Sequence, residues 1–175
     1  MSPHHVVVLL KLHTLGNPGW TYASLAKSLG FSTATVHEAI KEAEVARLFD
    51  PIKKEPNRRS LAEFIVHGLK YVFPAERGPE TRGIPTGFSA PNLEGSSIVP
   101  ATVPPVWPSP DGKVRGYALK PLFKNIKIAH IAIEQDPELY RLLALIDAIR
   151  DGTVRESNVA VQMICESLGV DNANA

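Results

Sequence analysis

The residues best suited to chemistry in this sequence are short polar side chains at the start of one expected helix, near Ser32. Hydroxyl and imidazole groups can hydrogen-bond to phosphate oxygens or to the edges of nucleotide bases. A carboxylate in the same place can accept from a cytosine amino group, although it repels phosphate. The side chains of this kind are Ser32, Thr33, Thr35, His37 and Glu38.

A second group of candidates is cationic. The net charge is only +1, but residues 1–87 carry eleven Lys/Arg against eight Asp/Glu, whereas residues 88–175 carry eight against ten. Within the first part, residues 53–59 hold four cations and one acid, a cluster that can contact phosphate. The candidates for phosphate contacts are Lys27, Lys41, Lys53, Lys54, Arg58 and Arg59, with a solvated surface charge as the alternative for each.

Three helices are expected to position these side chains within the first 48 residues. The first runs from Pro3 to Leu15 and is mostly apolar. The second has a cap at Thr21 or Ser24 and ends at Gly30, and the third is capped by Ser32. A short extended piece follows around residues 48–52, so any wing is short. A fourth helix then runs to Pro74, and its apolar stripe is expected to consist of Leu61, Phe64, Ile65, Leu69 and Val72.

The segment from Tyr22 to Lys41 has a small residue, Ala26, where two helices cross, and Gly30 where a left-handed turn is needed. It resembles the helix-turn-helix of MarR-type and related winged-helix transcriptional regulators. The resemblance implies that the helix from Ser32 enters the major groove of DNA. It makes the polar residues of that helix the candidates for DNA base contacts, namely Ser32, Thr33, Thr35, His37 and Glu38. Glu38 stands where these helices often present arginine, which weakens the expected grip on phosphate. A helix-turn-helix used only for protein contact is the alternative.

The rest of the chain divides by composition. Residues 74–110 hold nine of the fifteen prolines, together with many apolar residues, so we expect an extended segment that lies across the folded part or a partner chain. A β-hairpin around the turn at Ser109 to Gly112 is expected within it. Helices are expected from Lys120 to Ile133, from Pro137 to Gly152 and from about Val154 to Leu168.

A second resemblance covers most of the chain. The runs 64–75, 81–86, 89–91 and 142–149 are similar to a group of uncharacterised bacterial helix-turn-helix proteins, some of them encoded beside toxin-like genes. This resemblance implies an autorepressor or an antitoxin that neutralises a partner protein.

Other chemistry has little support. The single cysteine, Cys165, excludes an internal disulfide, and the six histidines lack the spacing of a zinc site, so we predict no metal and no cofactor. No phosphate loop or nucleophile motif is present, which argues against an enzyme. The longest apolar run, Val6 to Leu10, is too short to cross a bilayer, and we predict a cytoplasmic protein.

The sequence thus predicts a mainly α protein with a helix-turn-helix domain over residues 1–73, of the winged type. A proline-rich segment over 74–118 and a helical dimerisation region over 119–170 complete it. The predicted function is sequence-specific binding of double-stranded DNA by a homodimeric repressor. The leucine-rich helix from Pro137 to Arg150 either faces the partner subunit or forms intrachain core. The alternative function is that of an antitoxin or protein-interaction module.

Overall fold

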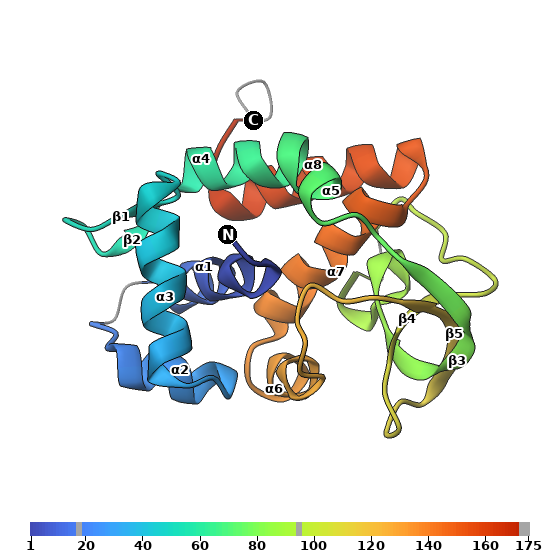
Figure 1. The fold of residues 1–175 in the computed structure, drawn as a ribbon. Helices are drawn as coiled ribbons and strands as arrows, with labels where there is room; N and C mark the ends of the chain where they lie inside the picture. Colours follow the sequence, from blue (N-terminus) through green and yellow to red (C-terminus); the bar gives the residue numbers. More distant parts are fainter. Residues whose placement is uncertain (17–18, 94–95, 172–175) are drawn as a thin grey trace.

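The computed structural model describes residues 1–16, 19–93 and 96–171. The fold is mostly helical and contains two small β-sheets, as Figure 1 shows. The expected mainly α architecture is therefore confirmed only in outline, because the sheets make the fold mixed.

The first three helices lie at the left and centre of Figure 1: α1 (Pro3–Leu15), α2 (Tyr22–Leu29) and α3 (Thr33–Val45). Their ends follow the sequence chemistry. The Thr21 and Ser32 hydroxyls each accept from an amide in the first turn, and Gly30 ends α2 at a φ of 65°, which a side chain disfavours. A short antiparallel pair follows, β1 (Phe49–Asp50) with β2 (Glu55–Pro56).

The expected fourth helix is interrupted by a wider turn. Asn57 caps α4 (Arg58–Glu63), a π-helical turn spans Phe64–Gly68, and α5 (Leu69–Val72) continues the same rod. The prediction that Val72 belongs to the buried stripe was wrong, because 55% of it is exposed. The extra residue in the π-turn rotates the positions that follow it.

The proline-rich segment folds into a small closed barrel of three strands, β3 (Arg77–Pro85), β4 (Pro105–Pro108) and β5 (Val114–Leu119). The expected hairpin is wrong in its pairing. β4 and β5 run parallel to each other, and both pair antiparallel with β3. Close approach of the backbones requires glycine, since a side chain at Gly116 would overlap the carbonyl of Pro104. Short 3₁₀ turns at Gly87–Ser89 and Pro91–Leu93 follow β3.

Three helices complete the chain: α6 (Lys127–Gln135), α7 (Pro137–Asp151) and α8 (Val154–Leu168). The prediction that α6 begins at Lys120 was wrong, and residues 121–126 form a loop instead. Burial explains the loop, because Phe123 packs edge-on against Trp107 with ring centroids 5.0 Å apart. α7 and α8 begin and end as expected.

One hydrophobic core joins the helices to the barrel, and residues from all three predicted segments contribute to it. α7 lies at its centre, with ten of its fifteen residues buried within this one chain. Of the two alternatives for the leucine-rich helix, the structure therefore contains the second: its apolar residues form core within their own chain. The proline-rich segment likewise packs on its own chain, through Trp107 and Tyr140, whose rings lie 5.6 Å apart.

Two buried polar networks fasten the helices. Lys11 of α1 forms a 2.7 Å ion pair with Asp136, the cap of α7. Asp147 of α7 accepts hydrogen bonds from Trp107 Nε1 at 2.6 Å and Thr86 Oγ1 at 2.8 Å, and pairs with Arg150 at 2.7 Å. Since all these donors meet one carboxylate, Asp147 fixes the barrel on α7.

Candidate nucleic-acid interface

The α2–α3 unit is held by a tight turn and by apolar contacts. Leu25 and Leu29 of α2 and Val36 of α3 are all buried. The amide of Phe31 donates to the carbonyl of Ala26 at 2.9 Å, which closes the turn after Gly30. These contacts fix the start of α3 relative to α2.

The five predicted base-contact residues do not share one environment. Thr33, His37 and Glu38 are exposed on α3. Ser32 Oγ accepts from the amide of Thr35 at 3.1 Å and lies 2.8 Å from Thr35 Oγ1, so these two hydroxyls are already engaged in the helix cap. Thr33, His37 and Glu38 are therefore the side chains free to meet a ligand without loss of the cap.

His37 is positioned by a neighbour on α2. Its ring centroid lies 5.1 Å from that of Tyr22, and the two rings are tilted by 40°. Both side chains are exposed, and they lie at the border between the two helices. This contact restricts the imidazole, which lowers the entropy lost when it binds a partner.

The exposed face of α3 is acidic. Glu38, Glu42 and Glu44 are exposed, against a single lysine, Lys41. Sequence reasoning singled out Glu38 and missed the other two acids. The helical positions 38, 42 and 44 lie outside the buried stripe of α3, a signal that a helical projection of the sequence contains.

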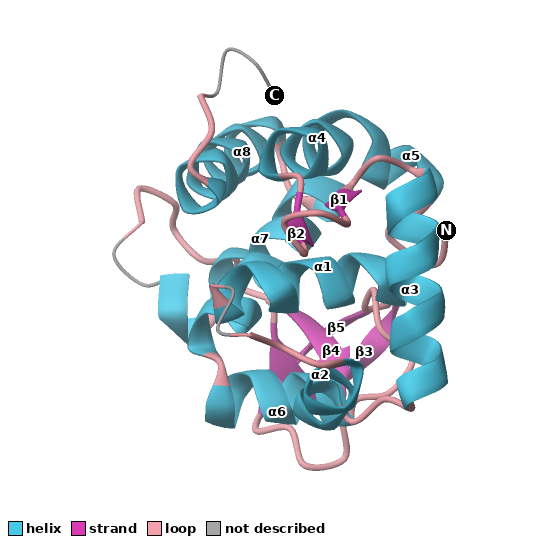
Figure 2. Cartoon of the chain, turned by 90° about the vertical axis from the view of Figure 1, so that its left-hand side faces the viewer, coloured by secondary structure: helices cyan, strands magenta, loops and turns pink. Residues whose placement is uncertain are grey.

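The β1–β2 pair presents the predicted cations beside α3, and Figure 2 shows this pair on the face that turns toward the viewer. Asp50 Oδ1 accepts from the amides of Ile52 at 2.9 Å and Lys53 at 3.1 Å, which shapes the tip. Trp20 Nε1 donates to the carbonyl of Lys54 at 2.9 Å, and Lys54 has a φ of 56°. The tip is thus fastened to the segment before α2, with both lysines exposed.

Lys53, Arg58 and Arg59 line one hollow of about 340 Å³, together with the acids Asp50 and Glu55. The predicted cationic cluster is therefore brought together by the fold, although two carboxylates share its surface. Lys27 and Lys41 lie apart from it, exposed on α2 and α3. Lys54, on the other side of the tip, lines a different hollow with Trp20 and Tyr22. Three of the six phosphate-contact candidates thus form one group, and the other three lie apart from it.

A larger basic stretch was missed in the sequence. Residues 112–133 contain Lys113, Arg115, Lys120, Lys124 and Lys127 and no Asp or Glu. The acids elsewhere in the second half of the chain hid this stretch, because charge was summed over residues 88–175. A shorter window would have found it.

Packing within the fold accounts for several other polar or titratable side chains. Burial lowers the pKa of His13, whose Nε2 lies 3.0 Å from the carbonyl of Ser167, and burial raises the pKa of the Cys165 thiol. Arg77 and Thr86 anchor the barrel, through Asp151 at 2.6 Å and through Asp147. Within the described ranges no cluster of histidine, cysteine and acidic residues could hold a metal, and no helix is long and apolar enough to span a membrane.

Compared with protein-family models, with curated proteins and with solved structures, the chain matches none of them.

Proposed function

We propose that this protein binds double-stranded DNA as a transcriptional regulator of the winged helix-turn-helix type. In this proposal α3 lies in the major groove and the β1–β2 pair is the wing. The observation that carries it is the α2–turn–α3 unit, capped at both helix starts and followed at once by a short strand pair whose tip presents Lys53 and Lys54.

The side chains have distinct roles in this proposal. Thr33 and His37, at the exposed start of α3, contact base edges. Glu38 accepts from a cytosine amino group. The cations of the wing and of the start of α4 contact phosphates, which hold the protein in register without reading sequence.

We further propose that the protein acts as a dimeric repressor, because duplex operators are commonly bound by two-fold dimers. The apolar side of α7 is covered within the chain. The dimer contact therefore has to use another surface.

The test is a titration of the purified protein against labelled fragments of its own upstream DNA, at several salt concentrations. Thr33→Ala and His37→Ala are expected to relax sequence preference, at a cost of about 1–3 kcal/mol per lost base contact. Arg58→Ala combined with Arg59→Ala is expected to weaken binding to all duplexes evenly and to lower the salt slope by about 2. Equal losses from both sets on all duplexes would show that α3 does not read bases.

Ser32 is left intact in this experiment. Because its hydroxyl caps α3, Ser32→Ala would cost about 1 kcal/mol of stability and mix a folding effect with a binding effect. Thr33 makes no such contact and leaves the helix unchanged.

A second candidate function is the neutralisation of a partner protein, as in an antitoxin. The acidic exposed face of α3 favours it, since Glu38, Glu42 and Glu44 would attract a basic protein surface. The substitution Glu38→Gln distinguishes the two functions by the direction in which affinity changes. If α3 binds DNA, the variant is expected to bind random duplexes more tightly; if α3 binds a basic protein, the variant loses affinity for that protein and gains none for DNA.

A further inference from the structure

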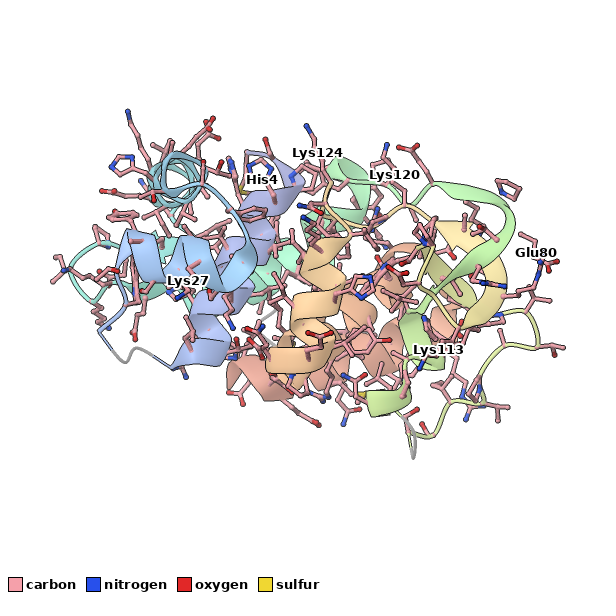
Figure 3. The ribbon with its side chains drawn as sticks, turned by 90° about the horizontal axis from the view of Figure 1, so that it is seen from below. His4, Lys27, Glu80, Lys113, Lys120 and Lys124 are labelled. Atoms are coloured by element: carbon pink, nitrogen blue, oxygen red, sulfur yellow. The ribbon has the colours of Figure 1, made fainter. Side chains whose placement is uncertain are left out.

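The acid-free stretch 112–133 is the most basic part of the chain. It holds five of the nineteen Lys/Arg and none of the eighteen Asp/Glu, which leaves fourteen cations against eighteen acids elsewhere. Figure 3 views the molecule from below, from the end at which α3 begins, and shows Lys120 and Lys124 at the upper edge near His4, with Lys113 and Lys27 lying apart from them farther down. The fold therefore brings Lys120 and Lys124 together beside the start of α1.

These cations are available to an external anion. Lys113 and Lys124 are exposed and form no ion pair with any residue that the structure describes. Lys120 pairs with Glu76 at 2.6 Å, but both side chains are more than 60% exposed. An exposed pair of this kind contributes only about 0–1 kcal/mol, so an incoming phosphate can displace the glutamate.

The pairing of β3 with β5 makes two further cations cross-strand neighbours. Arg82 lies directly opposite Arg115 in the ladder, and both are exposed. Like charges directly opposite destabilise a strand pair. Glu80 reaches Arg115 at 3.2 Å and offsets one of the two charges. An anion bound at this edge of the barrel would relieve the remaining repulsion.

A groove of about 690 Å³ runs between the barrel and the loop before α6. Three cations, Lys120, Lys124 and Arg77, and one acid, Glu76, line it, and Pro3 at the start of α1 is also part of its wall. His4, the next residue of α1, packs against Phe31 in the turn before α3, with ring centroids 6.0 Å apart. The pKa of His4 is lowered, chiefly by burial, while the charge of Glu38 acts to raise it and that of Lys124 to lower it. The start of α1 thus contacts both the groove, through Pro3, and the turn before α3, through His4.

We propose that the basic face made of Lys120, Lys124 and Arg77, the cations that line this groove, is a second contact surface for the phosphate backbone of duplex DNA. It binds the DNA beyond the part that α3 occupies. The proposal rests on the proposed function, and it explains how an acidic α3 can be held on a polyanion: the attraction comes from a neighbouring surface. The contact is with phosphates only, so it adds affinity for any sequence.

The test compares two double variants that each remove two charges. Lys120→Gln with Lys124→Gln changes the basic face. Lys70→Gln with Arg155→Gln is the matched control elsewhere on the surface. Fluorescence anisotropy with a labelled random-sequence duplex, measured at several salt concentrations, gives the salt slope. We expect the first variant to lower the slope by about 2, because each phosphate contact contributes about 0.9, and the control to leave it unchanged. A duplex too short to extend beyond α3 should not distinguish the two variants.

The outcomes separate this inference from the proposed function. If both double variants bind the long duplex like the unchanged protein, the basic face does not contact DNA, whatever the α3 variants do. If the basic-face variant alone loses affinity while Thr33→Ala and His37→Ala change nothing, the basic face contacts DNA and the proposed function fails. If polyglutamate competes for the basic face as well as the duplex does at equal charge, the surface fits an acidic protein and the DNA assignment is overturned.

Discussion

Replacement of Asp147 by alanine should be among the most destabilising single changes in this protein. Its carboxylate is 2% exposed and pairs with Arg150, whose side chain is 3% exposed. It is also the acceptor for Trp107 of β4 and for Thr86, which follows β3. Burial raises the pKa of this carboxyl, and Arg150 with the two neutral donors opposes that effect. The substitution removes the one group that all three donors share.

The expected loss in the free energy of unfolding follows from the buried donors that Asp147→Ala leaves without an acceptor. Loss of one partner of a buried ion pair costs about 3–5 kcal/mol, and each orphaned neutral donor adds about 1–3 kcal/mol. Two features reduce this sum. Arg150 still donates to the carbonyls of Phe73, Pro74 and Lys120, and a cavity of about 220 Å³ beside Asp147 can admit water to the vacated position. We expect a loss of about 4–6 kcal/mol, against a total stability of about 5–15 kcal/mol for a domain.

Urea unfolding followed by tryptophan fluorescence measures this loss, because Trp107 is 1% exposed in the folded protein. Asp147→Asn is the control that keeps the fold measurable. Its amide oxygen can still accept from Trp107 and Thr86 while the charge facing Arg150 is gone, so we expect about 2–4 kcal/mol. If both variants unfold within 1 kcal/mol of the unchanged protein, the barrel is not fastened to α7 through this carboxylate.

Three further predictions concern the N-terminal part of the chain. Lys11→Ala leaves the carboxylate of Asp136 without its buried partner and should cost about 3–5 kcal/mol in urea unfolding, less whatever Asp136 regains from solvent. Burial depresses the folded-state pKa of His13 below its ordinary 6.5, so the stability that this residue contributes is present above pH 6.5 and is lost as the pH falls below it. His13→Gln should therefore flatten the decline in unfolding free energy between pH 7.5 and 5, and an unchanged slope would contradict the burial argument. Lys54→Gly relieves a left-handed residue and should stabilise by about 0.5–1 kcal/mol in thermal unfolding, whereas Lys53→Gly should not.

The sequence predicted the helices well because their ends carry local chemistry. Thr21, Ser32 and Asp136 accept from first-turn amides, and Gly30 adopts the left-handed turn. Each signal acts over three or four residues, so it can be recognised without knowledge of the rest of the fold.

The barrel was not predicted, because its pairing is not local. β4 and β5 are close in sequence but pair in parallel, and both depend on β3, which lies some twenty residues upstream of β4. The turn at Ser109 to Gly112 favours a hairpin locally, and the contacts with β3 override it. Gly83 and Gly116 were the available signal, since glycine inside a strand often marks a close backbone approach.

The candidate interface was predicted in its residue types and only partly in its geometry. Capping explains why Ser32 and Thr35 are engaged: the same hydroxyls that suit base contacts also suit the first turn of a helix. The basic face was missed for a different reason: the net charge was summed over residues 88–175, and the acids in that range hid the run of Lys and Arg within residues 113–127.

The distribution of charge around α3 helps to weigh the two candidate functions. Glutamates occupy the exposed face of α3, while cations lie at its borders: Lys53 and Lys54 on the strand pair, and Lys124 beyond the first turn of α1. Interactions between exposed charges decay over about 8 Å at physiological salt, so border cations do not neutralise the central acids. A duplex on α3 would bring phosphates to the borders and base edges to the centre, where a carboxylate can accept from cytosine. A basic protein would instead meet repulsion at both borders, and this pattern therefore supports DNA as the ligand of α3.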